Sequence, residues 1–402
     1  MSITRRANGL IAVSSATLTG ALAFAGLLTL LFISPSSASG QAFSLLHQFR
    51  SGSGGINPYA GVVLDAKSNL YGTTYNDGAF ASGTVFRINS SGKEKVLHSF
   101  SQTGGDGTFP WYGSLVRDSS GNLYGTTLTG GTYEQCCGTI FKVDASGKET
   151  VLYSFTGTGE DGYFPQAGVV RDPSGNLYGM SESGGTGGAG TVFKLDTRGQ
   201  ETVLYSFTGS TDGGFPQAGL VLDTKGNLYG TTSGGGSSSY AGTVFKVDST
   251  GTETVLYTFT GSSDGGTPQS GLIRDSRGNL YGTTSAGGAI GYGTVFKINA
   301  QGQETVLHSF GGGSDGAAPS ESSLVRDSAG NLYGTTPQGG FTDFGIVFKI
   351  DPKGNETVLH TFSGSDGKIP YGTLVIDKAG NLYGTTYEGG AYGGGVVFKI
   401  AP

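Results

Sequence analysis

The chain is poor in the residues that most enzyme active sites and structural cross-links use. Its 402 residues contain four histidines, two cysteines, two methionines and one tryptophan. The cysteines, Cys136 and Cys137, are neighbours, and neighbouring cysteines can join only through a small strained ring. They therefore cannot link distant parts of the fold, and with few other ligands nearby they do not indicate a zinc site. We interpret them as small residues in a variable loop.

Charge is scarce as well, and it is not of the sign that nucleic acid attracts. The chain has 24 Lys and Arg residues against 30 Asp and Glu, a formal net charge of -6. Proteins that bind nucleic acid usually present a basic stripe or patch to the phosphates. No such stripe is visible here, so we expect no nucleic-acid partner.

The first 42 residues differ in kind from the rest. Arg5 and Arg6 precede a stretch, residues 9–33, without a single charge, and small residues follow it. This order is typical of a cleaved export signal, and cleavage is expected after Ser39, Gly40 or Ala42. The alternative is an uncleaved membrane anchor, because the stretch is long enough to span a bilayer. We expect an exported protein, extracellular, at the cell surface or periplasmic, that contacts a membrane only if the leader is retained.

What the chain has in excess is glycine and repetition. Glycine supplies 76 residues without the period of collagen, and aromatic residues are plentiful, which argues against disorder. The tetrapeptide NLYG recurs at intervals of 50 to 54 residues, beginning at Asn69, Asn122, Asn176, Asn227, Asn279, Asn331 and Asn381. A near-constant period of this length, rich in β-forming residues and turns, predicts a propeller of seven units.

One unit, residues 201–251, shows how a repeat folds. The runs ETVLYSF, LVLD, NLYGTT and TVFKVD are separated by turn residues and predict four short antiparallel strands. Gly226 and Gly251 occupy the two tight turns, where a positive φ is needed. In the first repeat Ser68 replaces the equivalent glycine, so we expect a left-handed residue or a different turn there.

The two ends of the chain complement each other. Residues 43–49, FSLLHQF, match the ETVLYSF strand alone, whereas the last unit ends after its TVFKVD-type strand at VVFKI. With LVLD innermost and ETVLYSF outermost, the N-terminal strand must complete the seventh blade and close the ring. The sequence therefore predicts an all-β, seven-bladed β-propeller of four-stranded antiparallel blades over residues 43–402, after a leader of residues 1–42, and we expect a monomer.

The motifs VLHSF, PxAGLVxD, GNLYGTT and GTVFKID, together with the Asp-Gly pairs between units, resemble the GloVer tandem repeat of exported bacterial proteins. They are more distantly similar to propeller repeats of the NHL type. The resemblance covers about residues 43 to 402. It implies a secreted or surface-anchored propeller of undetermined activity, and it transfers no catalytic residue.

The repeat positions of the rare polar residues argue against catalysis. The histidines, His47, His98, His308 and His360, stand where other units have tyrosine, so we interpret them as packing residues. Asp-Gly pairs between units offer one carboxylate each, fewer oxygens than calcium needs, and we interpret them as turns. These aspartates are Asp106, Asp161, Asp212, Asp264, Asp315 and Asp366. We expect no catalytic residue, metal or cofactor.

The units diverge most in two sets of loops that should share one face of the propeller. We call them inter-blade loops, which join one blade to the next, and blade-tip loops, which follow NLYGTT. After the recurring proline of the inter-blade loops, blades 1, 2 and 7 carry an aromatic residue, and these blades are adjacent once the ring closes. The predicted site residues are Tyr59, Trp111 and Tyr371 from inter-blade loops, and Tyr75, Asp77, Tyr133, Glu134, Tyr387, Glu388 and Tyr392 from blade-tip loops.

Aromatic rings beside carboxylates suit a neutral sugar, because a ring face packs on C–H surface while carboxylates accept hydrogen bonds from hydroxyls. The sequence therefore favours a binding or interaction module, with a glycan or an envelope or extracellular protein as partner. One alternative is a glycoside-active or other carbohydrate-modifying enzyme, since carboxylates could flank a bond. Another is a structural scaffold of the cell envelope. The aromatics could also serve only to pin the loops.

Overall fold

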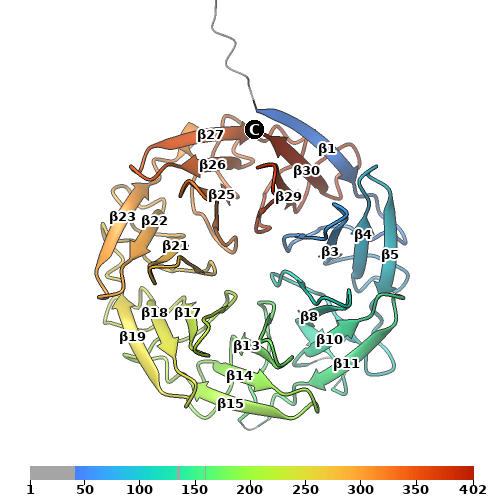
Figure 1. Cartoon of the computed structure of the whole chain (residues 1–402), viewed down its shortest axis with the longest axis horizontal. Helices are drawn as coiled ribbons and strands as arrows, with labels where there is room; N and C mark the ends of the chain where they lie inside the picture. The colour runs from blue at the N-terminus through green and yellow to red at the C-terminus, as the bar shows by residue number, and fades with distance from the viewer. Residues whose placement is uncertain (1–40, 134–135, 159) are drawn as a thin grey trace, which may run out of the picture. The chain divides into compact units, whose positions relative to one another are not determined.

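The computed structural model describes residues 41–133, 136–158 and 160–402, and these residues form a ring of seven four-stranded antiparallel sheets around a central channel (Figure 1). The predicted seven-bladed, all-β fold is confirmed. Apart from the blades, the described residues contain one two-stranded ribbon, β6 (Gly107–Thr108) with β9 (Thr129–Gly130), and one short 3-10 turn, Gly313–Asp315. None of the helical segments in the described residues is long and apolar enough to cross a membrane. The predicted leader lies almost wholly outside the described residues.

Each blade runs from an innermost strand at the channel to an outermost strand at the rim. The innermost strands are β2 (Val63–Leu64), β7 (Val116–Arg117), β12 (Val170–Arg171), β16 (Val221–Leu222), β20 (Ile273–Arg274), β24 (Val325–Arg326) and β28 (Val375–Ile376). The second strands are β3 (Leu70–Thr74), β8 (Leu123–Thr127), β13 (Leu177–Ser181), β17 (Leu228–Thr232), β21 (Leu280–Thr284), β25 (Leu332–Thr336) and β29 (Leu382–Thr386).

The third strands are β4 (Thr84–Ile88), β10 (Thr139–Val143), β14 (Thr191–Leu195), β18 (Thr243–Val247), β22 (Thr294–Ile298), β26 (Ile346–Ile350) and β30 (Val396–Ala401). The outermost strands are β5 (Glu94–Ser99), β11 (Glu149–Ser154), β15 (Glu201–Ser206), β19 (Glu253–Thr258), β23 (Glu304–Ser309), β27 (Glu356–Thr361) and, in blade 7, β1 (Ala42–Gln48).

The NLYG motif has a physical role at each position. In blade 1, Asp65 accepts hydrogen bonds from the Asn69 side-chain amide at 2.8 Å and from the Tyr71 hydroxyl at 3.1 Å, which ties the innermost hairpin together. Leu70 is buried in the core. A Cβ on the motif glycine, Gly72, would lie 2.7 Å from the Phe86 ring, so only glycine leaves room for that ring.

The first hairpin confirms one of the two conformations expected at its irregular turn. Ser68 has a φ of 61°, in the left-handed region that glycine occupies in the other units. Its backbone N–H still donates to the Asp65 carbonyl at 3.0 Å, the same bond that Gly121 makes to Asp118. The hydrogen bond therefore survives the substitution, at the cost of a strained residue.

Phenylalanine pairs join neighbouring blades all around the ring. The phenylalanine that follows each outermost strand packs on the phenylalanine of the third strand of the next blade, with ring centroids 5.0 to 5.3 Å apart in all seven cases. Both members of each pair are almost fully buried. The pairs place the hydrophobic core between blades rather than within any single blade.

The N-terminal strand closes the ring as predicted. β1 pairs antiparallel with β30, from Ala42 opposite Ala401 to Gln48 opposite Val396, and so becomes the outermost strand of blade 7. Phe49, which follows β1, packs on Phe86 of blade 1 at 5.1 Å. Strand β1 begins one residue before the predicted start of the propeller, because Ala42 already pairs with Ala401.

We expect Phe49→Ala to lower the free energy of unfolding by about 3–5 kcal/mol, because it removes the ring that locks blade 7 onto blade 1 and leaves a cavity. The change should appear as a lower midpoint of thermal and chemical unfolding. Phe341→Ala is the matched control, since Phe341 is 89% exposed, and it should leave the midpoint almost unchanged. Equal midpoints for the two variants would contradict closure through this contact.

Candidate functional site

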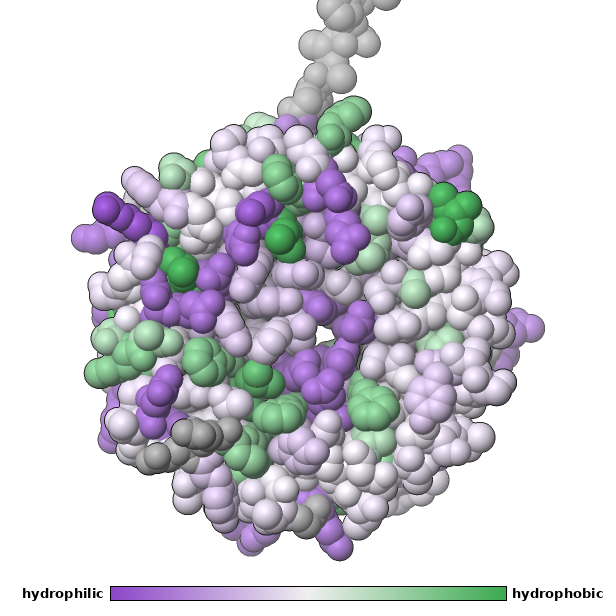
Figure 2. Space-filling view, turned by 180° about the vertical axis from the view of Figure 1, so that it is seen from behind, coloured by the Kyte–Doolittle hydropathy of each residue, from purple (hydrophilic) through white to green (hydrophobic). Residues whose placement is uncertain are grey.

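The inter-blade and blade-tip loops surround one end of the central channel, which we call the mouth. The face drawn in Figure 2 has a narrow opening near its centre, with hydrophilic side chains beside it and hydrophobic ones close by. The recurring proline of each inter-blade loop stands a few residues before an innermost strand, so the residue after it is carried to the channel. Each blade thus places the residue after its proline at the mouth.

The aromatic residues predicted from blades 1, 2 and 7 do come together, and Tyr59 is at the centre of the group. Its ring stacks on Tyr371 with centroids 4.6 Å apart and an angle of 3° between planes, and it lies 5.7 Å from Trp111 and 4.9 Å from Tyr387. Tyr75 packs edge-on against Trp111 at 5.0 Å. We call these five residues the aromatic cluster. Its rings pack on one another and are half-buried.

Two mouth residues were missed by the sequence reasoning, Tyr112 and Glu321. In blades 2 and 6 the proline stands five positions before the buried leucine that precedes the innermost strand, as Pro110 does before Leu115. In the other blades it stands four positions before the equivalent leucine or valine. The extra residue projects at the channel in both cases. Tyr112 packs edge-on against Tyr59 at 4.7 Å and so extends the aromatic cluster. Counting residues from the proline to the strand would have found both positions.

Glu321 brings a largely buried carboxyl group to the mouth. Burial raises its pKa to about 7, although the facing hydroxyls of Tyr112 and Tyr59 favour the ionised form. The carboxyl in turn helps burial to raise the pKa of both tyrosines. Its Oε2 atom is buried and has no hydrogen-bond partner, and its backbone is left-handed with a φ of 65°.

A cavity of about 190 Å³ lies in the channel beside these two residues. Tyr112 and Glu321 line it together with residues of the innermost strands and their approaches, among them Leu115, Val169 and Ser323. The other lining residues are glycines and residues with uncharged side chains, most of them small or apolar, so the Glu321 carboxyl is the charged group of the cavity. The cavity is smaller than the pockets of about 300–1,000 Å³ that hold whole small ligands.

The opposite arc of the mouth is polar. Glu182 accepts hydrogen bonds from the amides of Gln166 and, at 2.8 Å, Gln217. The Gln269 amide donates to Gln217 at 3.0 Å, which continues the chain into blade 5. The mouth therefore has an aromatic arc from blades 7, 1 and 2 and an amide arc from blades 3, 4 and 5.

Of the other predicted site residues, the two described carboxylates have partners outside the aromatic cluster, and the two remaining tyrosines are exposed. The Asp77 carboxylate accepts a hydrogen bond from the Gly52 backbone N–H at 3.1 Å, and Glu388 forms an ion pair with Lys368 at 2.8 Å. Tyr392 is exposed and lies near Arg50, 5.5 Å from its guanidinium carbon. Tyr133 is exposed as well. Glu134 lies outside the described residues.

The neighbouring cysteines do not link distant segments, since the sulfur atoms of Cys136 and Cys137 are bonded to each other. Cys137 is fully buried and belongs to the core between blades 2 and 3. The buried Cys137 side chain therefore contributes packing at the base of its loop.

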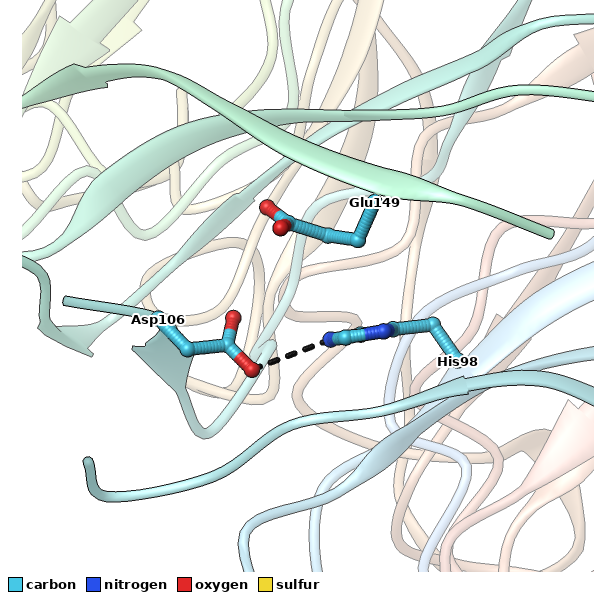
Figure 3. Close-up of side chains that lie close together, drawn as sticks. All are labelled: His98, Asp106 and Glu149. Carbon is cyan, nitrogen blue, oxygen red and sulfur yellow. Dashed lines mark hydrogen bonds and ion pairs between the residues drawn. The ribbon is translucent and has the colours of Figure 1, made fainter. Parts of the chain in front are cut away.

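A second polar cluster recurs between the outermost strands of neighbouring blades. At the junction of blades 1 and 2, His98 Nε2 lies 3.0 Å from Asp106 Oδ2, and Glu149 faces them both (Figure 3). Their ligand atoms lie within 4.8 Å of one another, a spacing that could hold a metal ion. At the next junction, however, the Tyr153 hydroxyl donates the same hydrogen bond to Asp161 at 3.0 Å. The arrangement thus forms without an imidazole, and we assign it to holding blades together.

The Asp-Gly aspartates also organise the inter-blade loops. The Asp212 carboxylate accepts hydrogen bonds from the Thr208 backbone N–H at 2.8 Å and from the Thr208 and Tyr205 hydroxyls. Each such aspartate therefore fastens its loop to the outermost strand that precedes it. At the last junction Phe43 takes the glutamate position and stacks on His360 with centroids 3.8 Å apart.

The glutamates of these clusters make stability depend on pH. Burial, reinforced by the neighbouring aspartate, raises the pKa from 4.5 to about 7 for Glu149, Glu201, Glu253, Glu304 and Glu356. A pKa that is higher in the folded than in the unfolded state gives stability that is complete below about pH 4.5 and is lost as the pH rises through 7. Burial lowers the pKa of His360. A lowered histidine pKa makes stability increase with pH, so this one group opposes the effect of the five glutamates.

We therefore expect the melting temperature to fall as the pH is raised from 5 to 8, measured by calorimetry at constant ionic strength. Glu253→Gln should melt higher than the parent at pH 8, because no charge is then buried, and should show a weaker pH dependence. The exposed Glu160→Gln is the control and should follow the parent curve. A parent melting temperature that is constant or rises over this range would refute the assignment.

Comparison with solved structures supports the fold. The extracellular domain of BT4673 from B. thetaiotaomicron is similar over 88% of this chain and 39% of its own length, with 12% identity and a TM-score of 0.57. PorZ, a surface component of the type-IX secretion system of Porphyromonas gingivalis, matches over 86% of this chain and 46% of its own, with 15% identity and a TM-score of 0.51. The chain thus spans less than half the length of these two proteins.

A gluconolactonase, XC5397 from Xanthomonas campestris, matches over 90% of both chains with 13% identity and a TM-score of 0.44. The likeness to BT4673 and PorZ, at identities of 12% and 15%, shows the fold alone, and the gluconolactonase match adds nothing to it. No curated protein matches the chain. The model of the Gloeobacter/Verrucomicrobia repeat family matches residues 9–241 and 221–402, which together hold all seven repeats. The chain therefore belongs to the Gloeobacter/Verrucomicrobia repeat family.

Proposed function

We propose that the protein is a carbohydrate-binding module that holds its ligand at the mouth of the channel. The observation that carries the proposal is the position of Trp111. Its indole lies in the aromatic cluster, and its Nε1 atom is buried without a hydrogen-bond partner. A buried N–H without an acceptor costs free energy, and a ligand hydroxyl that accepts from it would remove that cost. Aromatic faces beside a polar arc are what a sugar ring with its hydroxyls requires.

The amide arc supports the same proposal. Glu182, Gln217 and Gln269 form a connected chain of donors and acceptors across the mouth from the aromatic cluster. Such groups can exchange hydrogen bonds among themselves for hydrogen bonds to hydroxyls with little net loss. A pyranose that stacks on the aromatic arc would present its edge to this chain.

The contacts favour binding over hydrolysis. Glycoside hydrolysis commonly needs two carboxyl groups that flank one bond. Of the predicted carboxylates, Asp77 accepts a loop hydrogen bond and Glu388 is paired with Lys368. Glu182 is held by two glutamine amides. A partner protein of the envelope or the extracellular space is the second candidate, because exposed Phe80, Ile290 and Phe341 lie in the same sets of loops.

We expect Trp111→Ala to weaken the binding of a neutral oligosaccharide roughly thirtyfold, since aromatic anchors commonly contribute about 2 kcal/mol. Binding is measured by calorimetry against a panel of soluble polysaccharide fragments, with reducing ends assayed in parallel. Trp111 is the sole tryptophan, so its fluorescence reports the wild-type contact directly.

Tyr392→Ala is the control, because Tyr392 is an exposed tyrosine of blade 7 outside the aromatic cluster. It should bind with wild-type affinity. Wild-type affinity in Trp111→Ala would refute the mouth as the site. Release of reducing ends would favour the enzyme, and retention of one protein partner without glycan binding would favour the scaffold.

We also propose that the protein is exported by cleavage of its leader. The support is the order of Arg5 and Arg6, an uncharged apolar stretch and small residues before β1. Since Ala42 already pairs with Ala401, cleavage after Ser39 or Gly40 keeps β1 whole. We expect N-terminal sequencing of the exported protein to start at Gly40 or Gln41. A protein that keeps residues 1–39 and sediments with membranes would instead be anchored.

A further inference from the structure

Glu321 combines three unfavourable features in one residue. It is the extra residue of its loop, its backbone is left-handed with a φ of 65°, and the Oε2 atom of its half-buried side chain is inaccessible to solvent and has no hydrogen-bond partner. A left-handed backbone at a residue other than glycine and a buried acceptor without a donor each cost free energy. Costs of this kind concentrate where a ligand later makes the missing contact.

The surroundings of this carboxyl define the group that would complement it. The titratable groups that face it are the hydroxyls of Tyr59, Tyr112 and Tyr371, none of which carries a positive charge. Lys368, a cation in a neighbouring loop, is paired with Glu388. Aromatic faces attract cations through their negative quadrupole, so the cluster adds to the attraction of the carboxylate.

We propose that Glu321 forms a subsite for a cationic amine, so that the mouth prefers oligosaccharides of amino sugars with free amines over their N-acetylated forms. This inference rests on the proposed carbohydrate-binding function and names its ligand class. The ammonium group donates to the ionised carboxylate of Glu321, and the ring that bears it packs on the aromatic cluster.

The size and make-up of the cavity agree with an amine rather than a metal ion or a whole sugar chain. A metal ion would need several oxygen ligands, whereas the cavity offers one carboxylate, and its volume of about 190 Å³ suits one end of a ligand. An N-acetyl group presents a neutral amide with a bulky methyl in place of three N–H donors. The amide would therefore donate fewer hydrogen bonds to the Glu321 carboxylate than an ammonium group does.

Ionisation of Glu321 is part of the binding step. Burial keeps a share of the carboxyl protonated near neutral pH, with a pKa of about 7. When an ammonium group enters, the carboxylate form is favoured and the proton leaves to solvent. Amine binding at pH 6.5 should therefore release protons, whereas binding of the N-acetylated ligand should release few.

The test compares two ligands of equal length, a glucosamine tetramer and an N-acetylglucosamine tetramer, by calorimetry at pH 6.5 in buffers of different ionisation enthalpy. We expect the wild-type protein to bind the free amine roughly tenfold more tightly, as for hydrogen bonds to a charged group, and to release protons. Glu321→Gln should lose both the preference and the proton release. Glu321→Gly fits the left-handed backbone without strain and should behave in the same way, which separates the effect from misfolding.

The exposed Glu160→Gln is the control and should keep the wild-type preference. If both tetramers bind equally in the wild type and Glu321→Gln changes nothing, the amine subsite is refuted, while Trp111-dependent binding of either ligand still supports the proposed function. If neither tetramer binds at millimolar concentration, the amine subsite is refuted as well, and the panel of other glycans then decides the proposed function separately.

Discussion

Packing of one phenylalanine from each blade against a phenylalanine of the next is the contact on which the rest of this structure depends. It works because the motif glycine of the second strand leaves space for the third-strand ring, as Gly72 does under Phe86, where a Cβ would come within 2.7 Å. A single blade exposes half of this core and would be unstable alone. The ring must therefore close, and β1 closes it by pairing with β30 and by placing Phe49 on Phe86.

Closure also creates the candidate site. Tyr59 and Tyr371 are far apart in the sequence, yet their rings stack at 4.6 Å, because blades 7 and 1 are neighbours in the ring. Because the Phe pairs hold the blades, the loops at the mouth can differ in sequence without loss of the fold. Two of these loops have one additional residue each, Tyr112 and Glu321, and both residues line the cavity in the channel.

The fold could be predicted from the sequence because the same pattern of strands and turns recurs seven times. Blade number, strand order and closure followed from the period, the turn glycines and the unmatched strands at the two ends. Ser68 is left-handed, which was one of the two conformations expected at its turn. The gathering of Tyr59, Trp111 and Tyr371 also followed from the ring. The directions of the polar side chains could not be predicted from the ring. Asp77 accepts a hydrogen bond within its loop and Glu388 pairs with Lys368, and these local contacts are not part of the repeat pattern. Tyr112 and Glu321 were not predicted, because aligning the repeats on the proline hides the additional residue that each of these two loops has before its strand.

The proposed ligand site is the mouth, with Trp111 and Glu321. A crystal structure of residues 41–402 with a glucosamine oligosaccharide tests it most directly. We expect a sugar ring against the indole of Trp111, with its ammonium group hydrogen-bonded to Glu321 in the channel. An oligosaccharide bound on the outer rim or on the opposite face, with the mouth unchanged, would contradict it.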